Sequence, residues 1–382
     1  MGGANLGKAA NFTFHKMRQS TFFSDQIKLV IGGQAGWSGQ NEYIESNADQ
    51  HDILALAPYF GNLQVHDTVE NSYGPLYAFP VQERTTGNTN QTAKILADKG
   101  HGTTLALYEI NFHYTDASEG TPPPSVRNPW MTGVAGGINL PWSMLNYLQY
   151  YGAQPSCAFS FLGYSFLYSG AAFPAQCDYP DCSFARVWGL MRDLSGLGTK
   201  RPTWLTSTLV NRAMFSKLIS TSQSGDNPAW TQSAINSIVA EISVPYINSF
   251  AFSSGNGKWS LVVFNLHVSQ ALNIVVNTPT TPSSNLNLYQ LSSTNPTDGN
   301  EVSDSVSISI QVKSDFASGY SLTLPPHSVS SLVWTDQSYI PPTSPASSPR
   351  SSTPTVTTSN SITAWILLSP TVWIAGAWFN LL

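Results

Sequence analysis

Residues 105–112 read LALYEINF, an apolar run of strand length that carries one carboxylate, Glu109. Further apolar runs of strand length stand at 27–33 (IKLVIGG), 53–59 (ILALAPY) and 156–163 (SCAFSFLG). Segments with a helical pattern separate these runs. Apolar strands that alternate with helices predict a parallel sheet buried on both faces.

The helical segments complete this pattern. We expect helices over 5–19, 41–50, 92–99, 140–152, 184–194 and 202–220. The helix over 140–152 should begin near Pro141, because proline is favoured in a first helical turn. Four strand-and-helix units then fill the span 1–225, which is half of an eight-unit barrel. The sequence therefore predicts an α/β domain over 1–240, the C-terminal half of a (β/α)8 TIM barrel.

The pattern changes near residue 245. Seven short runs with alternating apolar residues follow, at 246–253, 259–266, 271–276, 286–291, 306–312, 320–324 and 328–334. Turn clusters rich in Gly, Asn, Pro and Ser lie between them. Short strands at close spacing predict an all-β domain, an antiparallel β-sandwich, over 241–337.

The C-terminal segments have a different composition. Residues 338–361 consist largely of Pro, Ser and Thr, which predicts a solvated stalk. Residues 362–382 form an uncharged apolar tail of 21 residues, long enough to span a bilayer. Small residues at 351–353, a polar spacer and an apolar tail are the order of a GPI-attachment signal. A single C-terminal membrane helix is the alternative, and both place the protein outside the cell, at its surface.

The composition limits the class of partner. Charged residues make up 10% of the chain, aromatic residues 12%, and the formal net charge is −5. Low charge with many aromatic and neutral polar side chains suits a secreted protein that binds carbohydrate, although a β-rich surface protein would have the same composition. The sequence has no basic run, so nucleic acid is not an expected partner. It also lacks four closely spaced Cys or His ligands, so we expect no metal and no cofactor.

The cysteines and sequons give weaker indications. Cys177 and Cys182 bound a short loop that could close as a disulfide, which would leave Cys157 as a buried thiol. Asn11 and Asn90 each begin an Asn-X-Thr glycosylation sequon, which weakly favours secretion.

The candidate chemistry lies where the strands end, since barrel enzymes place their sites at the carboxyl ends of the strands. Simple strand alternation puts one set of side chains on a single face: Leu107, Glu109, Asn111 and His113. Burying Glu109 without a partner would be costly. Tyr59, at the end of its strand, could donate its hydroxyl to that carboxylate and hold it ionised. A structural Glu in a salt bridge, and a tyrosine that packs on the rim, are the alternatives.

The loop after the strand at 27–33 is rich in glycine and contains Gln34 and Trp37. Glycines allow backbone to approach a ligand, and Trp37 could stack on a sugar ring. An exposed loop anchor is the alternative for Trp37.

The three strand ends IKLVIGGQ, ILALAPYF and LALYEINFH resemble strands five, six and seven of clan A glycoside hydrolases. The similar families are arabinofuranosidase-like and heparanase-like, which carry a β-sandwich after the barrel. The resemblance covers about residues 5–335. It implies that Glu109 is the nucleophile, that Tyr59 contacts it, and that Asn111 and His113 line the sugar subsite.

The sequence departs from that clan at the acid/base residue. The clan carries it as the Glu of an Asn-Glu pair after strand four, and no such strand precedes residue 27. Asn41-Glu42 follows the first strand, which favours a surface or helix-cap role for Glu42 over the alternative that Glu42 is the acid. We therefore expect a retaining O-glycosyl hydrolase for polysaccharide or glycoconjugate that is incomplete, and inactive, as this chain. The alternative is a non-catalytic cell-surface protein that binds carbohydrate or has a structural role.

Overall fold

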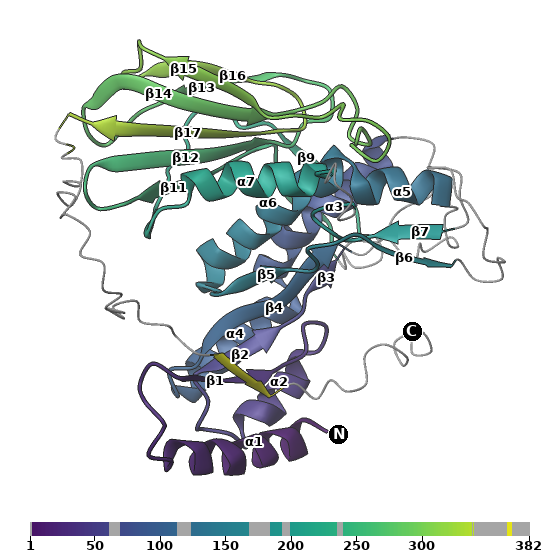
Figure 1. Ribbon diagram of the computed structural model, residues 1–382, viewed down its shortest axis with the longest axis vertical. Helices are drawn as coiled ribbons and strands as arrows, with labels where there is room; N and C mark the ends of the chain where they lie inside the picture. Colours follow the sequence, from purple (N-terminus) through teal and green to yellow (C-terminus); the bar gives the residue numbers. More distant parts are fainter. Residues whose placement is uncertain are drawn as a thin grey trace, which may run out of the picture.

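The computed structural model describes residues 2–60, 69–112, 124–167, 184–192, 199–234, 240–337, 339 and 365–368. Figure 1 shows a parallel sheet with its helices in the lower part and antiparallel sheets at the top. The helices of the described residues are α1 (Gly3–Arg18), α2 (Ser38–Glu45), α3 (Val69–Thr85), α4 (Asn88–Lys99), α5 (Pro124–Thr132), α6 (Val134–Tyr151) and α7 (Pro202–Ala213). Helices α3, α6 and α7 lie between the two regions.

The parallel sheet is arranged around β4. Its strands are β1 (Lys28–Gly32), β2 (Ile53–Leu56), β3 (Tyr59–Phe60), β4 (Thr104–Phe112), β5 (Ser156–Ala158) and β18 (Trp365–Leu368). Strand β4 pairs with β2, β3 and β5, and every pair is parallel. Strand β1 follows on the far side of β2. The parallel sheet predicted for this region is confirmed.

Both faces of this sheet are buried. One face joins the main core with the helices through Leu29, Ile31, Leu54, Leu56, Leu105 and Leu107. The opposite face forms a smaller cluster of Val30, Ile53, Ala55 and Ala106. Burial on two sides explains why these strands are apolar throughout.

The C-terminal region contains a six-stranded antiparallel sheet in the order β15-β14-β17-β12-β11-β8. Its strands are β8 (Lys217–Ile219), β11 (Ile247–Ser253), β12 (Lys258–Asn265), β14 (Pro282–Leu291), β15 (Ser309–Lys313) and β17 (Ser328–Asp336). The antiparallel pair β13 (Leu272–Val276) and β16 (Tyr320–Leu324) shares a core with one face. Helix α7 packs on the other face (Figure 1). The antiparallel strands predicted here are confirmed.

Two helix predictions are wrong in part. Residues 184–194 were expected to be helical, but Phe184–Val187 forms β7, antiparallel to β6 (Tyr164–Leu167). The helix expected over 202–220 ends at Ala213, and Lys217–Ile219 within that range forms β8 against β11. Short apolar runs fit a helix or a strand by periodicity alone, and pairing with a distant strand decides between them.

Prolines account for further differences between the expected and the observed helices. Helix α6 begins at Val134, so Pro141 lies inside the helix and not near its start. Helices α3 and α5 were not expected, and they contain Pro75, Pro80 and Pro129. Proline in a helix interior normally costs about 3 kcal/mol, so the sequence favoured breaks there. Tertiary packing overrides that preference. Another pair, β9 (Ala229–Gln232) and β10 (Ile242–Pro245), lies beside α3.

Part of the apolar tail lies in the parallel sheet. The four residues of β18 pair with β1 in parallel, where a membrane segment was expected. Within the described ranges, no helix is both long enough and apolar enough to span a membrane. The remaining tail, and the stalk apart from residue 339, lie outside the described residues.

The C-terminal region contains a histidine, His327, whose pKa is lowered by burial. His327 is fully buried before β17, with Nδ1 2.7 Å from the Val268 carbonyl oxygen. Burial lowers the pKa of His327, and hydrogen bonds to the backbone only partly oppose this. A folded-state pKa below the unfolded value of about 6.5 means that its stabilisation is present above that pH and lost as the pH falls, by up to about 1.4 kcal/mol per pH unit.

We expect His327→Asn to flatten this acid dependence, since asparagine tolerates the φ of 28° at this position. Urea denaturation between about pH 7 and pH 5 measures the free energy of unfolding of both proteins, over a range that begins above the unfolded histidine pKa. Equal slopes against pH for the two proteins would contradict the assignment.

Candidate functional site

Strand β4 contains one extra residue beside Glu109. From Leu107 to Asn111, β4 advances by four residues. Its neighbours β2 and β3 advance by only three over the same stretch, from Leu56 to Tyr59. An extra residue opposite a shorter partner is a β-bulge.

The pairing on the other side of β4 locates this bulge. Three steps along β4, from Leu107 to Ile110, match two steps along β5. The extra residue therefore lies between Leu107 and Ile110, where Glu109 stands. Bulges often lie next to active sites, because they re-aim a side chain.

The bulge changes the face on which Glu109 lies. Leu107 and Ile110 both belong to the main core, although they are three residues apart. Ala106 belongs to the cluster on the opposite face. Glu109 and Asn111, which alternate with Ile110, therefore point to the side of Ala106, away from the helices. The expectation that Leu107 shares a face with Glu109 is wrong, because simple alternation ignores the extra residue.

Tyr59 and Glu109 form a direct pair. The Tyr59 hydroxyl donates a hydrogen bond of 2.7 Å to Oε2 of Glu109, and both residues are half-buried. Burial raises the pKa of Tyr59, and the carboxylate beside it raises that pKa further. The hydroxyl thus keeps its proton at neutral pH and remains a donor. This is the contact expected from the strand ends, and it orients the Glu109 carboxyl group.

Aromatic rings surround the Tyr59 side chain. The ring centroids of Phe159 and Trp188 lie 6.2 and 5.5 Å from that of Tyr59, and 5.3 Å from each other. The indole Nε1 of Trp188 donates to the carbonyl of Phe112 at 3.1 Å, which ties the ring to the end of β4. We call Tyr59, Phe159 and Trp188 the aromatic cluster. Of this cluster, Tyr59 contacts the Glu109 carboxylate directly.

Asn111 holds the backbone together at this point. Its Nδ2 donates to the carbonyl of Phe159, and its Oδ1 accepts the N–H of Phe112 at 2.9 Å. Both ends of the amide are thus engaged within the protein, and Asn111 is buried. The structure therefore favours a backbone-bracing role for Asn111 over the expected contact with a sugar. His113 lies outside the described residues.

The loop after β1 is not part of the Glu109 group. Oδ1 of Asn41 accepts the N–H of Gln34 at 2.7 Å, and its Nδ2 donates to the Gln34 carbonyl at 2.8 Å. Trp37 is 58% exposed at the start of α2. Strand β2 lies between β1 and β4, so the loop stands two strands away from Glu109. Glu42 is exposed on α2, as expected for a surface residue.

The Cys157 thiol and the two sequon asparagines lie in a strand and in helices of the parallel region. Cys157 is exposed on β5, not buried as expected, because β5 is an edge strand of the described sheet. Cys177 and Cys182 lie outside the described residues. Asn11 and Asn90 lie in α1 and α4. Their side chains bind backbone: Asn11 accepts the N–H of Asp49 at 3.3 Å, and Asn90 donates to the carbonyl of Thr85 at 2.8 Å.

The sequence reasoning missed Phe159 and Trp188. Phe159 directly follows β5, which ends at Ala158, whereas the strand expected over 156–163 placed Phe159 inside the strand and not at its end. Trp188 follows β7, which the sequence pattern had assigned to a helix. An error in the element thus concealed a residue of the site.

Comparison with known proteins identifies the fold. No family model matches the sequence, and a search of curated proteins finds no match. An α-L-arabinofuranosidase from Thermotoga maritima, solved with arabinose, matches at a TM-score of 0.63 and 14% identity, over 87% of this chain and 62% of that one. A family 51 α-L-arabinofuranosidase from Bifidobacterium longum gives 0.64 and 12%, over 87% and 63%. A family 44 xyloglucanase from Paenibacillus polymyxa gives 0.50 and 9%, over 88% and 61%.

The structural likeness agrees with the resemblance found at the strand ends. The chain shares its fold with part of these glycoside hydrolase structures, and it spans less than two thirds of their length. At such low identity the likeness concerns the fold, so activity has to be argued from the Glu109 group itself.

Proposed function

We propose that this protein is a retaining O-glycosyl hydrolase that acts on polysaccharide or glycoconjugate, with Glu109 as its nucleophile. One observation carries the proposal: a bulge in β4 sets Glu109 on the face away from the helices, where Tyr59 holds one oxygen at 2.7 Å. The fold similarity to α-L-arabinofuranosidases supports a carbohydrate substrate. On this proposal the parallel sheet is the last half of a (β/α)8 barrel, followed by a β-sandwich.

The Tyr59 hydrogen bond assigns separate roles to the two carboxylate oxygens. Tyr59 engages Oε2, which leaves Oε1 of Glu109 to attack the anomeric carbon. A glycosyl ester forms as the bond to the leaving oxygen breaks, and that oxygen takes a proton from a second carboxyl group. Water then hydrolyses the ester, with the second group acting as base.

We infer that the described part of the parallel region does not supply this second carboxyl group. Its partly or fully buried carboxylates have other partners: Glu45 binds His51 at 2.7 Å, Asp52 binds Arg18 at 3.1 Å, and Glu83 accepts the N–H of Thr89 at 3.0 Å. Glu42 is exposed on α2. Retaining enzymes hold their two carboxyl groups about 5–5.5 Å apart. We therefore propose that the described residues do not complete the catalytic pair by themselves.

Covalent labelling tests the role of Glu109. A panel of activated 2-deoxy-2-fluoro glycosides, including the arabinofuranoside, is expected to esterify Glu109, and mass spectrometry of the peptide holding 105–112 locates the sugar. We expect Tyr59→Phe to label about 10- to 100-fold more slowly, because a hydrogen bond to a charged group contributes about 1.5–3 kcal/mol. Tyr150→Phe, which alters an exposed tyrosine on α6, is the matched control.

Other outcomes of the labelling experiment would contradict the role of Glu109 as the nucleophile. Label on a different carboxylate, or label that persists in Glu109→Gln, removes Glu109 as the nucleophile. A protein that only binds carbohydrate would bind these sugars, remain unlabelled and be indifferent to Glu109→Gln.

We also propose that the tail over 362–382 directs the protein to the cell surface as a GPI-attachment signal. Attachment removes the tail, so the mature protein should lack β18 and expose β1 as the edge of its sheet. We expect phosphatidylinositol-specific phospholipase C to release the protein from intact cells. Protein that resists release and retains a peptide from 365–368 would instead carry its tail.

A further inference from the structure

The loop between β14 and β15, residues 292–308, reaches from the antiparallel region onto the helices. The N–H groups of Val134 and Ala135 open α6, and they donate to the carbonyls of Asp298 and Pro296 at 2.8 and 2.7 Å. Such first-turn N–H groups have no acceptor within their own helix. The loop therefore caps α6 from another region of the fold.

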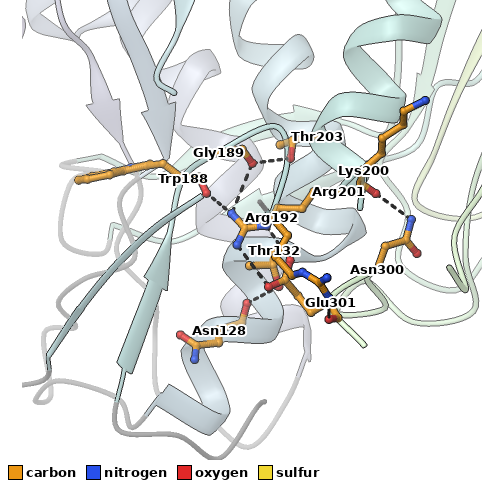
Figure 2. Close-up of polar contacts among 10 residues, drawn as sticks. All are labelled: Asn128, Thr132, Trp188, Gly189, Arg192, Lys200, Arg201, Thr203, Asn300 and Glu301. Atoms are coloured by element: carbon orange, nitrogen blue, oxygen red, sulfur yellow. Dashed lines mark hydrogen bonds and ion pairs between the residues drawn. The ribbon is translucent and has the colours of Figure 1, made fainter. Parts of the chain in front are cut away.

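The same loop carries a buried ion pair. Glu301 accepts two hydrogen bonds from Arg201, at 2.7 Å from Nε to Oε1 and at 3.3 Å from Nη2 to Oε2 (Figure 2). Each of the two side chains is only 1% exposed. Arg192 donates to the backbone carbonyl of Glu301 at 2.6 Å. A bidentate pair of this kind fixes the plane of the guanidinium group as well as its position.

The guanidinium group in turn holds the backbone at Trp188. Nη1 of Arg201 donates to the carbonyl of Trp188 and, at 3.4 Å, to that of Gly189 (Figure 2). Thr203 also donates to the Gly189 carbonyl, at 3.2 Å. Trp188 has a φ of 40°, in the left-handed region that a residue with a side chain rarely adopts. The hydrogen bonds from Arg201 and Thr203 hold the chain in this turn.

The Trp188 ring then reaches the candidate site. It packs on Tyr59 and Phe159 within the aromatic cluster, and Tyr59 is bonded to Glu109. A continuous set of contacts thus runs from Glu301 in the antiparallel region to the Glu109 carboxylate in the parallel sheet.

We propose that Glu301 is a positioning residue for this site: through Arg201 it fixes the Trp188 turn and, with it, the aromatic cluster around Tyr59 and Glu109. Its consequence for catalysis rests on the proposed function, whereas the placing of Trp188 does not. A merely structural ion pair would stabilise the fold and leave the Trp188 ring where it is.

Fluorine NMR of protein labelled with 5-fluorotryptophan measures a chemical shift that depends on the surroundings of the Trp188 ring. The chain has 11 tryptophans, and Trp188→Phe assigns the resonance. We expect Glu301→Gln to shift or broaden that resonance and to slow labelling of Glu109 at least tenfold. Arg201→Lys, which keeps the charge and loses the planar fork, is expected to do the same. Glu42→Gln, on the exposed face of α2, is the matched control and should change neither measurement.

Each result decides a separate point. If Glu301→Gln folds and its Trp188 resonance is unchanged, the proposal is overturned. If Glu301→Gln does not fold, the Trp188 resonance of Arg201→Lys provides the same test. A shifted resonance with unchanged labelling overturns the link to Glu109. If the unaltered chain takes no label, the proposed function fails, and the Trp188 resonance alone decides the positioning role.

Discussion

Dinitrophenyl glycosides are expected to react with this chain, whereas glycosides of simple alcohols are not. Dinitrophenolate is stable without a proton, so its departure needs no acid. An alkoxide has to be protonated as it leaves, and general acid catalysis contributes about 10²- to 10⁴-fold to such a step. We infer that the described parallel region lacks this acid, so the contrast between the two leaving groups should be of that size.

The time course of dinitrophenolate release should also show whether the glycosyl ester is hydrolysed slowly. On the proposed function Glu109 forms the ester, and we infer that the described parallel region supplies no positioned base to activate water for its hydrolysis. We therefore expect a burst of about one dinitrophenolate per chain and then a slow phase, since a stalled covalent intermediate accumulates. Azide, which attacks without a base, should accelerate the slow phase. Stopped-flow absorbance measures both phases, on a panel of sugars that includes the arabinofuranoside.

Two variants make this test decisive. Glu109→Gln should reduce the burst rate by at least about 10⁴-fold, as removal of a covalent nucleophile does in other hydrolases. Glu42→Gln should leave both phases unchanged, because Glu42 is exposed on α2. Equal turnover of alkyl and dinitrophenyl glycosides would show that the chain contains its own acid, and loss of the alkyl activity in Glu42→Gln would identify it.

Replacement of Trp142 by alanine is expected to lower the free energy of unfolding by about 3–5 kcal/mol. Trp142 lies on α6 and is 1% exposed. Its ring packs on Phe250 and Phe264 of the six-stranded sheet, with centroid distances of 5.9 and 5.7 Å. Its Nε1 donates to the carbonyl of Tyr77 at 3.4 Å. The substitution would open a cavity between the two regions and leave that carbonyl without its partner.

The same substitution tests whether the regions unfold together. Residues of both regions belong to one continuous core, so urea should unfold them in a single transition that Trp142→Ala moves to lower urea. Far-UV circular dichroism is dominated by the helices, which lie within residues 3–213, and tryptophan fluorescence comes from tryptophans of both regions, such as Trp130 and Trp334. The two signals should change together. Trp37→Ala, at a position 58% exposed, should change the stability by no more than about 0.5 kcal/mol. Two separate transitions in the unaltered protein would contradict a shared core.

The sequence by itself determined the parallel sheet and the hydrogen-bonded pair of Tyr59 and Glu109. Strands buried on both faces must be apolar throughout, and this local property is visible in the runs at 27–33, 53–59 and 105–112. Tyr59 and Glu109 stand near the carboxyl ends of two neighbouring strands, so their contact at 2.7 Å follows from the parallel arrangement.

Only the tertiary structure decided on which face of the sheet Glu109 lies and which residues surround the pair. The bulge in β4 comes from its registers with β2, β3 and β5, which alternation within one strand does not reveal. Helices α3 and α5 form despite internal prolines, because packing outweighs local preference. Glu301 and Arg201 are 100 residues apart, and neither has a local pattern that indicates the other. Local periodicity records whether a residue is buried, whereas the identity of its partners depends on the whole fold.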